Sequence, residues 1–225
     1  MDKITISHLV EFNRKTPKGR RTLVEKLKKP KIKPEKSEGG GDYWISAVSC
    51  ISRAFEAGNN TEIVEKIDEL LEKIENSDAK ITKNMFQRNI HILQKFEEFD
   101  FAQLKPKKFQ FQKRSKKQSI VVLKKLPLYA KPNHVFLFED NGVKKIGAIW
   151  FVAKLDGFTQ DELSMITDIL YRYLELNYSD SFEVATNFCI AFDVTTINIL
   201  SYAQLGNKRI KSPLIEIVNE INQYI

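Results

Sequence analysis

Hydrophobic residues recur at helical spacing through the first hundred positions of the chain. This pattern predicts three consecutive amphipathic helices over about residues 43–58, 61–77 and 81–99. Two shorter helices are predicted before them, within residues 8–15 and 19–29. Between the two groups, residues 30–41 contain Pro30, Pro34 and three consecutive glycines. Because proline and glycine clusters interrupt regular structure, this stretch is predicted to be a connector.

From about residue 105 the pattern changes to the two-residue alternation of strands. Phe109 and Phe111 alternate with glutamine, and residues 119–126 are rich in β-branched side chains. Strands are predicted near 134–140 and 144–154, joined at Asn141-Gly142, a pair that readily adopts a tight hairpin turn. A long helix should follow over about 158–178, then one or two strands within 187–205 and a last helix from Ser212-Pro213.

The long helix carries a start signal of its own. Thr159 precedes its first turn, and Glu162 stands three residues later, which is the spacing of a capping box. Together these patterns predict an α+β protein. A mainly helical N-terminal portion, 1–104, should precede a C-terminal α/β portion, 105–225, with a mostly antiparallel or mixed sheet flanked by helices.

Composition narrows the classes of protein. No stretch of about 18 apolar residues is present, so no membrane span is expected. The two cysteines, Cys50 and Cys189, lie in apolar patterns and are expected to be buried thiols of a cytoplasmic protein. The three histidines have no cysteine or acid at ligand spacing, so no zinc site is predicted.

Charge is segregated along the chain. Lys and Arg outnumber Asp and Glu by 12 to 4 in residues 1–36 and by 13 to 2 in residues 105–154, whereas acids prevail elsewhere. Such basic blocks can neutralise phosphates, and phenylalanines such as Phe109 and Phe111 can stack on unpaired bases. We therefore expect a DNA or RNA interface built from a hairpin over 105–125 and an arm over 14–36. The candidate contacts are Lys107, Lys108, Lys113, Arg114, Lys116, Lys117, Arg20 and Arg21.

The order of elements from about 82 to 205 resembles the helix, three strands, helix and strand of PD-(D/E)XK nucleases. In that family a carboxylate on the second strand and an acid-x-Lys triplet on the third bind a divalent metal. By this resemblance Asp140, or Glu139, would match the first acid and Lys154 the lysine. Val152 replaces the second carboxylate, although Asp156 could substitute from the loop. The motif is thus degenerate, and the resemblance implies a nuclease-like fold that has lost catalysis.

Three functions follow as hypotheses. The first is a non-catalytic nucleic-acid-binding protein without metal or other cofactor. The second is an active nuclease that uses Mg²⁺, Asp140 and Lys154. The third is an adaptor whose opposed charge blocks dock on a protein partner or on a second copy of the chain. A composition rich in Lys, Ile and Asn is typical of AT-rich bacterial genomes, and such chains are often associated with host defence or mobile elements.

Overall fold

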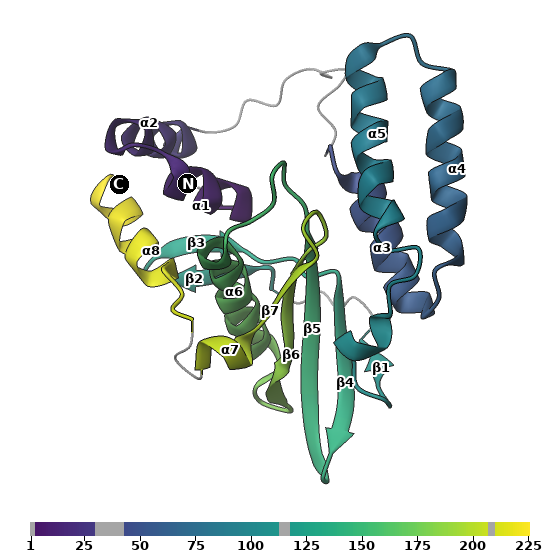
Figure 1. The fold of residues 1–225 in the computed structure, drawn as a ribbon. Helices are drawn as coiled ribbons and strands as arrows, with labels where there is room; N and C mark the ends of the chain where they lie inside the picture. The colour runs from purple at the N-terminus through teal and green to yellow at the C-terminus, as the bar shows by residue number, and fades with distance from the viewer. Residues whose placement is uncertain (1–2, 30–42, 113–117, 207–209) are drawn as a thin grey trace.

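The structure is a computed structural model that describes residues 3–29, 43–112, 118–206 and 210–225. Its helices and strands alternate much as the sequence predicts (Figure 1). The described helices are α1 (Ile6–Arg14), α2 (Pro17–Lys28), α3 (Ile45–Ala57), α4 (Thr61–Glu75), α5 (Lys80–Gln94), the 3-10 helix η1 (Phe101–Leu104), α6 (Gln160–Tyr178), α7 (Tyr202–Gly206) and α8 (Leu214–Gln223). The described strands are β1 (Gln110–Phe111), β2 (Ile120–Leu123), β3 (Leu126–Tyr129), β4 (His134–Asp140), β5 (Val143–Val152), β6 (Glu183–Asp193) and β7 (Asn198–Ser201).

The central sheet has five strands in the order β1-β4-β5-β6-β7. Neighbouring strands are antiparallel except β5 and β6, which run parallel because α6 connects them in a crossover. A separate two-stranded sheet contains β2 and β3. The mixed sheet with flanking helices confirms the predicted α+β class.

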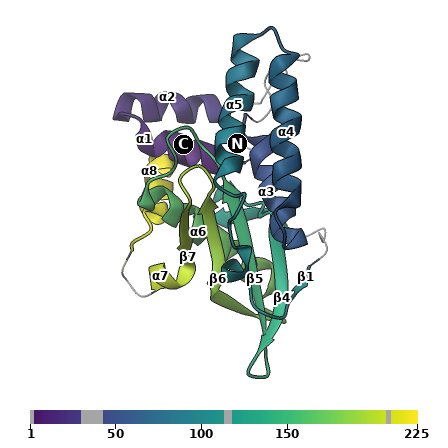
Figure 2. The same ribbon diagram turned by 45° about the vertical axis from the view of Figure 1, so that its right-hand side comes forward.

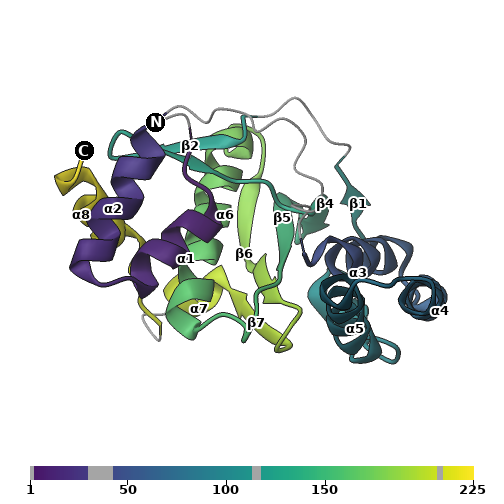
Figure 3. The same ribbon diagram turned by 90° about the horizontal axis from the view of Figure 1, so that it is seen from above.

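Helices cover both faces of the sheet (Figure 3). Along β5, Ile146 and Ala148 face one core with α1, α2, α6 and α8, whereas Ile149 and Phe151 face the other core with α3, α4 and α5. Both faces of β5 are therefore buried, which explains its near-continuous apolar run. The packing also divides the predicted N-terminal portion, 1–104, because α1 and α2 lie on the opposite side of the sheet from α3–α5 (Figure 3).

Local signals place several elements where the sequence predicts them. The Thr159 side chain accepts from the Glu162 backbone N–H, and a Glu162 carboxylate oxygen accepts from the Thr159 N–H, so the capping box is confirmed. The β4–β5 hairpin is confirmed too, with Asn141 and Gly142 at φ 51° and 78°. The last helix begins one residue later than predicted, at Leu214, with Pro213 at the cap position.

The predicted hairpin over 105–125 is wrong. β1 pairs with β4 at the edge of the central sheet, and β2 pairs with β3 across a two-residue turn, Lys124-Lys125. Both lysines have positive φ, 47° and 70°. Asparagine and glycine favour this backbone conformation and lysine does not, so the sequence carried no turn signal there.

In the described residues, no helix is long and apolar enough to cross a membrane.

Replacing Gly142 by valine is expected to lower the free energy of unfolding by about 1 kcal/mol or more. No atom lies within 4 Å of a Cβ built at Gly142, so the cost comes from the positive φ alone. The melting temperature should fall by about 2–4 °C per kcal/mol in a chain of this size. Gly206→Val is the matched control, because Gly206 has equally open surroundings without a positive φ. Equal melting temperatures for the two variants would contradict the assignment of strain to the turn.

Candidate nucleic-acid interface

Asp140 and Lys154 lie at opposite ends of the β4–β5 hairpin. Asp140 pairs with Val143 at the turn, whereas Val152, two residues before Lys154, pairs with Asp193 at the other end of β5. A ten-residue strand is about 30 Å long. The turn extends away from the helices, as Figures 1 and 2 show. The two residues therefore cannot share a metal ion, and the match suggested by the nuclease resemblance does not form a site.

Asp140 has local partners at the turn. Its carboxylate accepts from Lys145 Nζ at 2.9 Å and from the Asn141 side chain at 3.2 Å. The adjacent Glu139 is exposed and stands opposite Lys144 in the hairpin register. These contacts stabilise the turn of the hairpin. None of them involves a residue at the Lys154 end of β5.

Three carboxylates lie near Lys154: Asp156 in the exposed loop after β5, Asp193 at the end of β6, and Glu162 in the first turn of α6. Asp193 is fully buried. Its oxygens accept hydrogen bonds from the Phe158 N–H at 2.9 Å, the Thr195 N–H at 2.9 Å and the Thr196 hydroxyl at 2.7 Å. Asp193 thus joins the loop after β5 to the β6–β7 turn through three hydrogen bonds.

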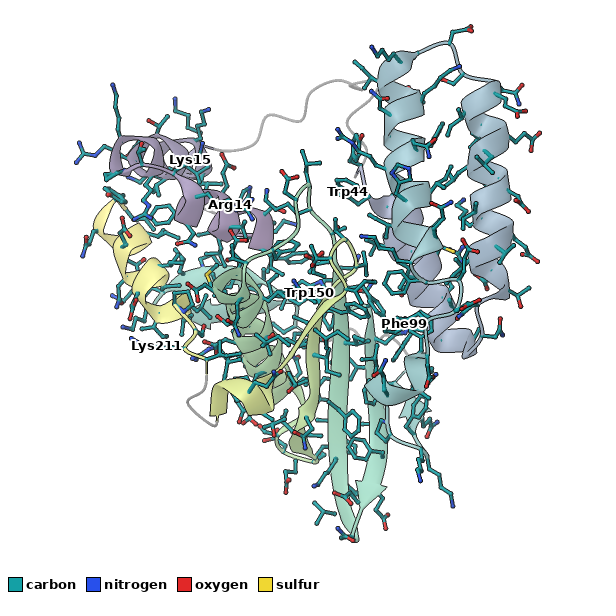
Figure 4. All side chains as sticks on the ribbon, viewed as in Figure 1. Arg14, Lys15, Trp44, Phe99, Trp150 and Lys211 are labelled. Carbon is teal, nitrogen blue, oxygen red and sulfur yellow. The ribbon has the colours of Figure 1, made fainter. Side chains whose placement is uncertain are left out.

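Glu162 is also buried, and Arg14 binds it from α1. Arg14 Nε and Nη2 donate to the two carboxylate oxygens at 2.5 and 2.6 Å, and Nη2 also donates to the Gly157 carbonyl at 3.1 Å. Figure 4 shows Arg14 on α1 above α6. Burial raises the pKa of the Glu162 carboxyl, but the hydrogen bonds from Arg14 and Thr159 and the charges of Arg14 and Lys154 outweigh burial and lower it. Glu162 therefore stays ionised and fastens α1 to α6.

These carboxylates do not form a metal site. Within the described ranges, no group of three or more His, Cys, Asp or Glu side chains is arranged to hold a metal ion. Asp193 and Glu162 instead bind backbone N–H groups, a hydroxyl and a guanidinium. The end of β5 is therefore a structural junction between α1, α6, β6 and the loop after β5.

The predicted nucleic-acid contacts fall in different places. Lys107 and Lys108 are exposed just before β1, at the edge of the sheet, whereas Lys113, Arg114, Lys116 and Lys117 lie outside the described residues. Phe109 and Phe111 do not form an open stacking surface. Their rings lie 4.9 Å apart and contact Phe136 in the core next to α3.

Arg20 and Arg21 differ, although they are adjacent in sequence. Arg20 Nη1 donates to both carboxylate oxygens of Glu220 on α8 at 2.8 Å, and its other nitrogens donate to the Phe12 and Asn13 carbonyls. Its donors are thus used within the protein, so the structure does not support Arg20 as a phosphate contact. Arg21 is exposed, with its guanidinium 5.9 Å from the Tyr224 ring centroid.

The exposed side of α2 is basic. Leu23 and Val24 point into the core, and Lys18, Arg21 and Lys26 of the same helix are exposed. The neighbouring helix α8 connects this side to the β2–β3 turn, because Lys124 Nζ donates to Asn219 at 2.7 Å and its carbonyl accepts from Asn222. Figure 3 shows α2 beside α8. We call these exposed cations of α2, its C-cap and the β2–β3 turn together the basic face: Lys18, Arg21, Lys26, Lys29, Lys124 and Lys125.

The acidic residues near the basic face are already neutralised. Each glutamate of α1, α2 and α8 forms an ion pair with a lysine or arginine: Glu11 with Lys15, Glu25 with Lys28, Glu216 with Lys211 and Glu220 with Arg20. Across the part of the chain that the structure describes, no ion pair involves a residue of the basic face. The face therefore carries a surplus of positive charge.

Of this face the sequence analysis named only Arg21 individually, although the predicted segments 14–36 and 105–125 contain the other five residues. Lys18 and Lys26 occupy exposed positions of α2, and Lys29 is its C-cap, so the run of basic residues in the predicted helix already indicated a positively charged element. The position of Lys124 and Lys125 next to α8 could not be predicted, since it depends on contacts with residues almost 100 positions later.

No protein-family model matches this chain, and neither does a curated protein or a solved structure.

Proposed function

We propose that this protein binds the phosphate backbone of DNA or RNA through the basic face, without catalysis. One observation carries the proposal. Cations from two distant segments, α2 and the β2–β3 turn, lie on either side of α8, and the nearby glutamates are already paired. Surplus lysines and arginines on one surface displace the counterions of a polyphosphate, which supplies most of the affinity of sequence-independent binding.

The dimensions of the face suit a polymer better than a single phosphate. Glu220 and Tyr224 of α8 face α2, because they contact Arg20 and Arg21. Asn219 and Asn222 of α8 face the β2–β3 turn, because they hydrogen-bond Lys124. A helix with its side chains is about 10 Å wide. Cations on both sides of α8 are therefore spaced over a distance that includes several successive phosphates of a nucleic-acid strand. Contacts of this kind carry no base information, so similar affinity for different sequences is expected.

The test is a salt titration of binding to a labelled 20-nucleotide DNA or RNA, single- and double-stranded. The triple variant Lys18→Gln, Arg21→Gln, Lys26→Gln should flatten the log–log salt slope by about 2–3 units, at roughly 0.7–0.9 for each phosphate that the variant no longer neutralises. These side chains are exposed, so the thermal melt should change little. A control variant removes the same charge elsewhere: Lys107→Gln, Lys108→Gln, Lys144→Gln.

The outcomes separate the possible interfaces. A flattened slope in the triple variant and an unchanged slope in the control support the basic face. The variant Lys113→Ala, Arg114→Ala, Lys116→Ala, Lys117→Ala tests the segment before β2. If that variant flattens the slope and the triple variant does not, the proposed face is wrong. If the wild-type protein binds none of the nucleic acids at about 50 mM salt, the function itself is wrong.

A further inference from the structure

The strand β2 has one edge bonded to β3 and the other turned away from it. Ser119 O accepts from the Ala130 N–H at 2.8 Å, and the register continues through Val121–Leu128 and Leu123–Leu126. In an antiparallel pair, alternate residues direct their N–H and C=O groups to the partner strand. The residues between them, Ile120 and Val122, therefore direct theirs to the outer edge.

The outer edge of β3 is already paired. Ile4 N donates to Pro127 O at 2.8 Å, and Tyr129 N donates to Ile4 O at 2.8 Å. Ile4 thus acts as a short neighbouring strand to β3. Of the two edges of this small sheet, only that of β2 is left without a strand among the residues described in the structure.

One residue of α6 shows how the β2 edge can be bound. The Asn177 side chain accepts from the Gln118 N–H at 3.0 Å and donates to the Gln118 carbonyl at 3.1 Å. A single amide thus makes the two bonds that a neighbouring strand would make. The next outward groups, at Ile120 and Val122, receive no hydrogen bond from the described part of the chain. Unbonded N–H and C=O groups in a row are a template for an added strand.

A groove runs beside this edge, between β2 and α6. Its volume is about 400 Å³. Val122 and Leu176 line it and are 62% and 51% exposed, so apolar side chains of both β2 and α6 are accessible to a ligand in the groove. Tyr171 and Tyr202 also line it, with rings stacked 3.7 Å apart at 5°. The groove therefore offers apolar surface next to a strand edge, which is the combination that binds extended peptides.

The charges in the groove favour a basic side chain. Arg172 Nε donates to Asp168 Oδ1 at 2.8 Å, so the positive charge of Arg172 is compensated within α6. Glu175 lines the groove and hydrogen-bonds Tyr171. Burial, followed by the charge and hydrogen bond of Glu175, raises the pKa of the Tyr171 hydroxyl to about 12, so this hydroxyl stays a donor at neutral pH. The surplus charge is that of Glu175, and a cation near it could also contact the tyrosine rings.

We propose that this groove binds an extended peptide segment of a partner protein, which adds as a strand to β2. Apolar side chains of the peptide pack on Val122 and Leu176, and a lysine or arginine of the peptide pairs with Glu175. The site is distinct from the basic face. A nucleic acid is an unsuitable ligand for it because Glu175 would repel phosphate.

The experiment uses the full chain and fluorescein-labelled seven-residue peptides that alternate valine with lysine, glutamine or glutamate. The lysine peptide should bind with a Kd of about 10–100 µM, and at least about tenfold more tightly than the glutamate peptide. Val122→Lys should weaken binding of the lysine peptide by about tenfold or more, because it removes apolar surface and adds like charge. Val64→Lys, at a 49% exposed valine of α4, is the matched control and should bind as the wild type does.

A second variant tests the role of the Glu175 charge. The oligomeric state tests whether a second copy of the chain, and not a peptide of another protein, binds the β2 edge. Glu175→Gln should weaken binding of the lysine peptide severalfold and leave the glutamine peptide unaffected. Failure of all three peptides to bind at 1 mM, or equal binding of the lysine and glutamate peptides, would overturn the proposal. So would a wild-type dimer in light scattering that Val122→Lys converts to monomer, since a second copy would then occupy the edge. None of these results depends on nucleic-acid binding.

Discussion

Asp193→Ala is expected to lower the free energy of unfolding by about 3 kcal/mol or more. The fully buried carboxylate accepts from Phe158, Thr195 and Thr196, so its removal leaves three donors without an acceptor. A donor left without a partner away from water costs about 1–3 kcal/mol; the exposed Thr196 hydroxyl can donate to water instead, so the loss comes mainly from the part-buried N–H groups of Phe158 and Thr195. Chemical denaturation with a fluorescence readout of the two tryptophans measures the loss.

Asp180→Ala is the control for this prediction. Asp180 is exposed just after α6, and its replacement should change stability by no more than about 0.5 kcal/mol. Asp193→Asn provides a finer test. The amide keeps one acceptor oxygen but places an NH₂ group against the donors, so the variant should also be destabilised. A wild-type midpoint for Asp193→Asn would mean that the carboxylate charge and its second oxygen contribute nothing.

Arg14→Ala should lower the free energy of unfolding by about 2 kcal/mol at pH 7. Removal of one partner from a buried ion pair costs about 3–5 kcal/mol. A smaller loss is expected here, because the Arg14 side chain is 39% exposed although that of Glu162 is 1% exposed. Arg53→Ala is the matched control. It breaks a similar pair with Glu62 whose side chains are 52% and 39% exposed, and it should cost about 0.5 kcal/mol.

The effect of Arg14→Ala should depend on pH. The folded pKa of Glu162 is lowered, so the stability that this group contributes is present above the unfolded pKa, near 4.3, and is lost as pH falls through the folded pKa. Without Arg14, its hydrogen bond and charge no longer lower the pKa of the Glu162 carboxyl, so the folded pKa rises. The difference between wild type and variant should therefore be largest near pH 7 and shrink below about pH 4. A difference that stays constant from pH 7 to pH 3 would contradict the role of Glu162.

The parts of the fold that the sequence predicts are those set by neighbouring residues. The capping box at Thr159 and Glu162 involves residues three apart, and the turn at Asn141-Gly142 follows from backbone preferences of two residues. The amphipathic helices α3, α4 and α5 likewise follow from their own periodicity. Each signal is complete within a few residues of sequence, so no knowledge of the rest of the chain is required.

The candidate surfaces depend instead on distant residues. Arg14 and Glu162 are 148 positions apart, and Arg20 and Glu220 are 200 apart. No local pattern distinguishes Arg20, whose donors are used internally, from the exposed Arg21. Asp140 and Lys154 are separated for a local reason. The Asn141-Gly142 turn fixes the register of the β4–β5 hairpin, which places Asp140 at the turn and Lys154 beyond the opposite end of β5.

The contact between α2 and α8 also has a consequence for synthesis on the ribosome. The chain emerges from its N-terminus at about 5–20 residues per second, so Glu220 follows Arg20 after about 10–40 s. During that interval Leu23, Val24 and Phe12 have no α8 to pack against. The earliest helices are therefore among the last to be buried, and the nascent chain exposes an amphipathic, positively charged segment that chaperones would be expected to bind.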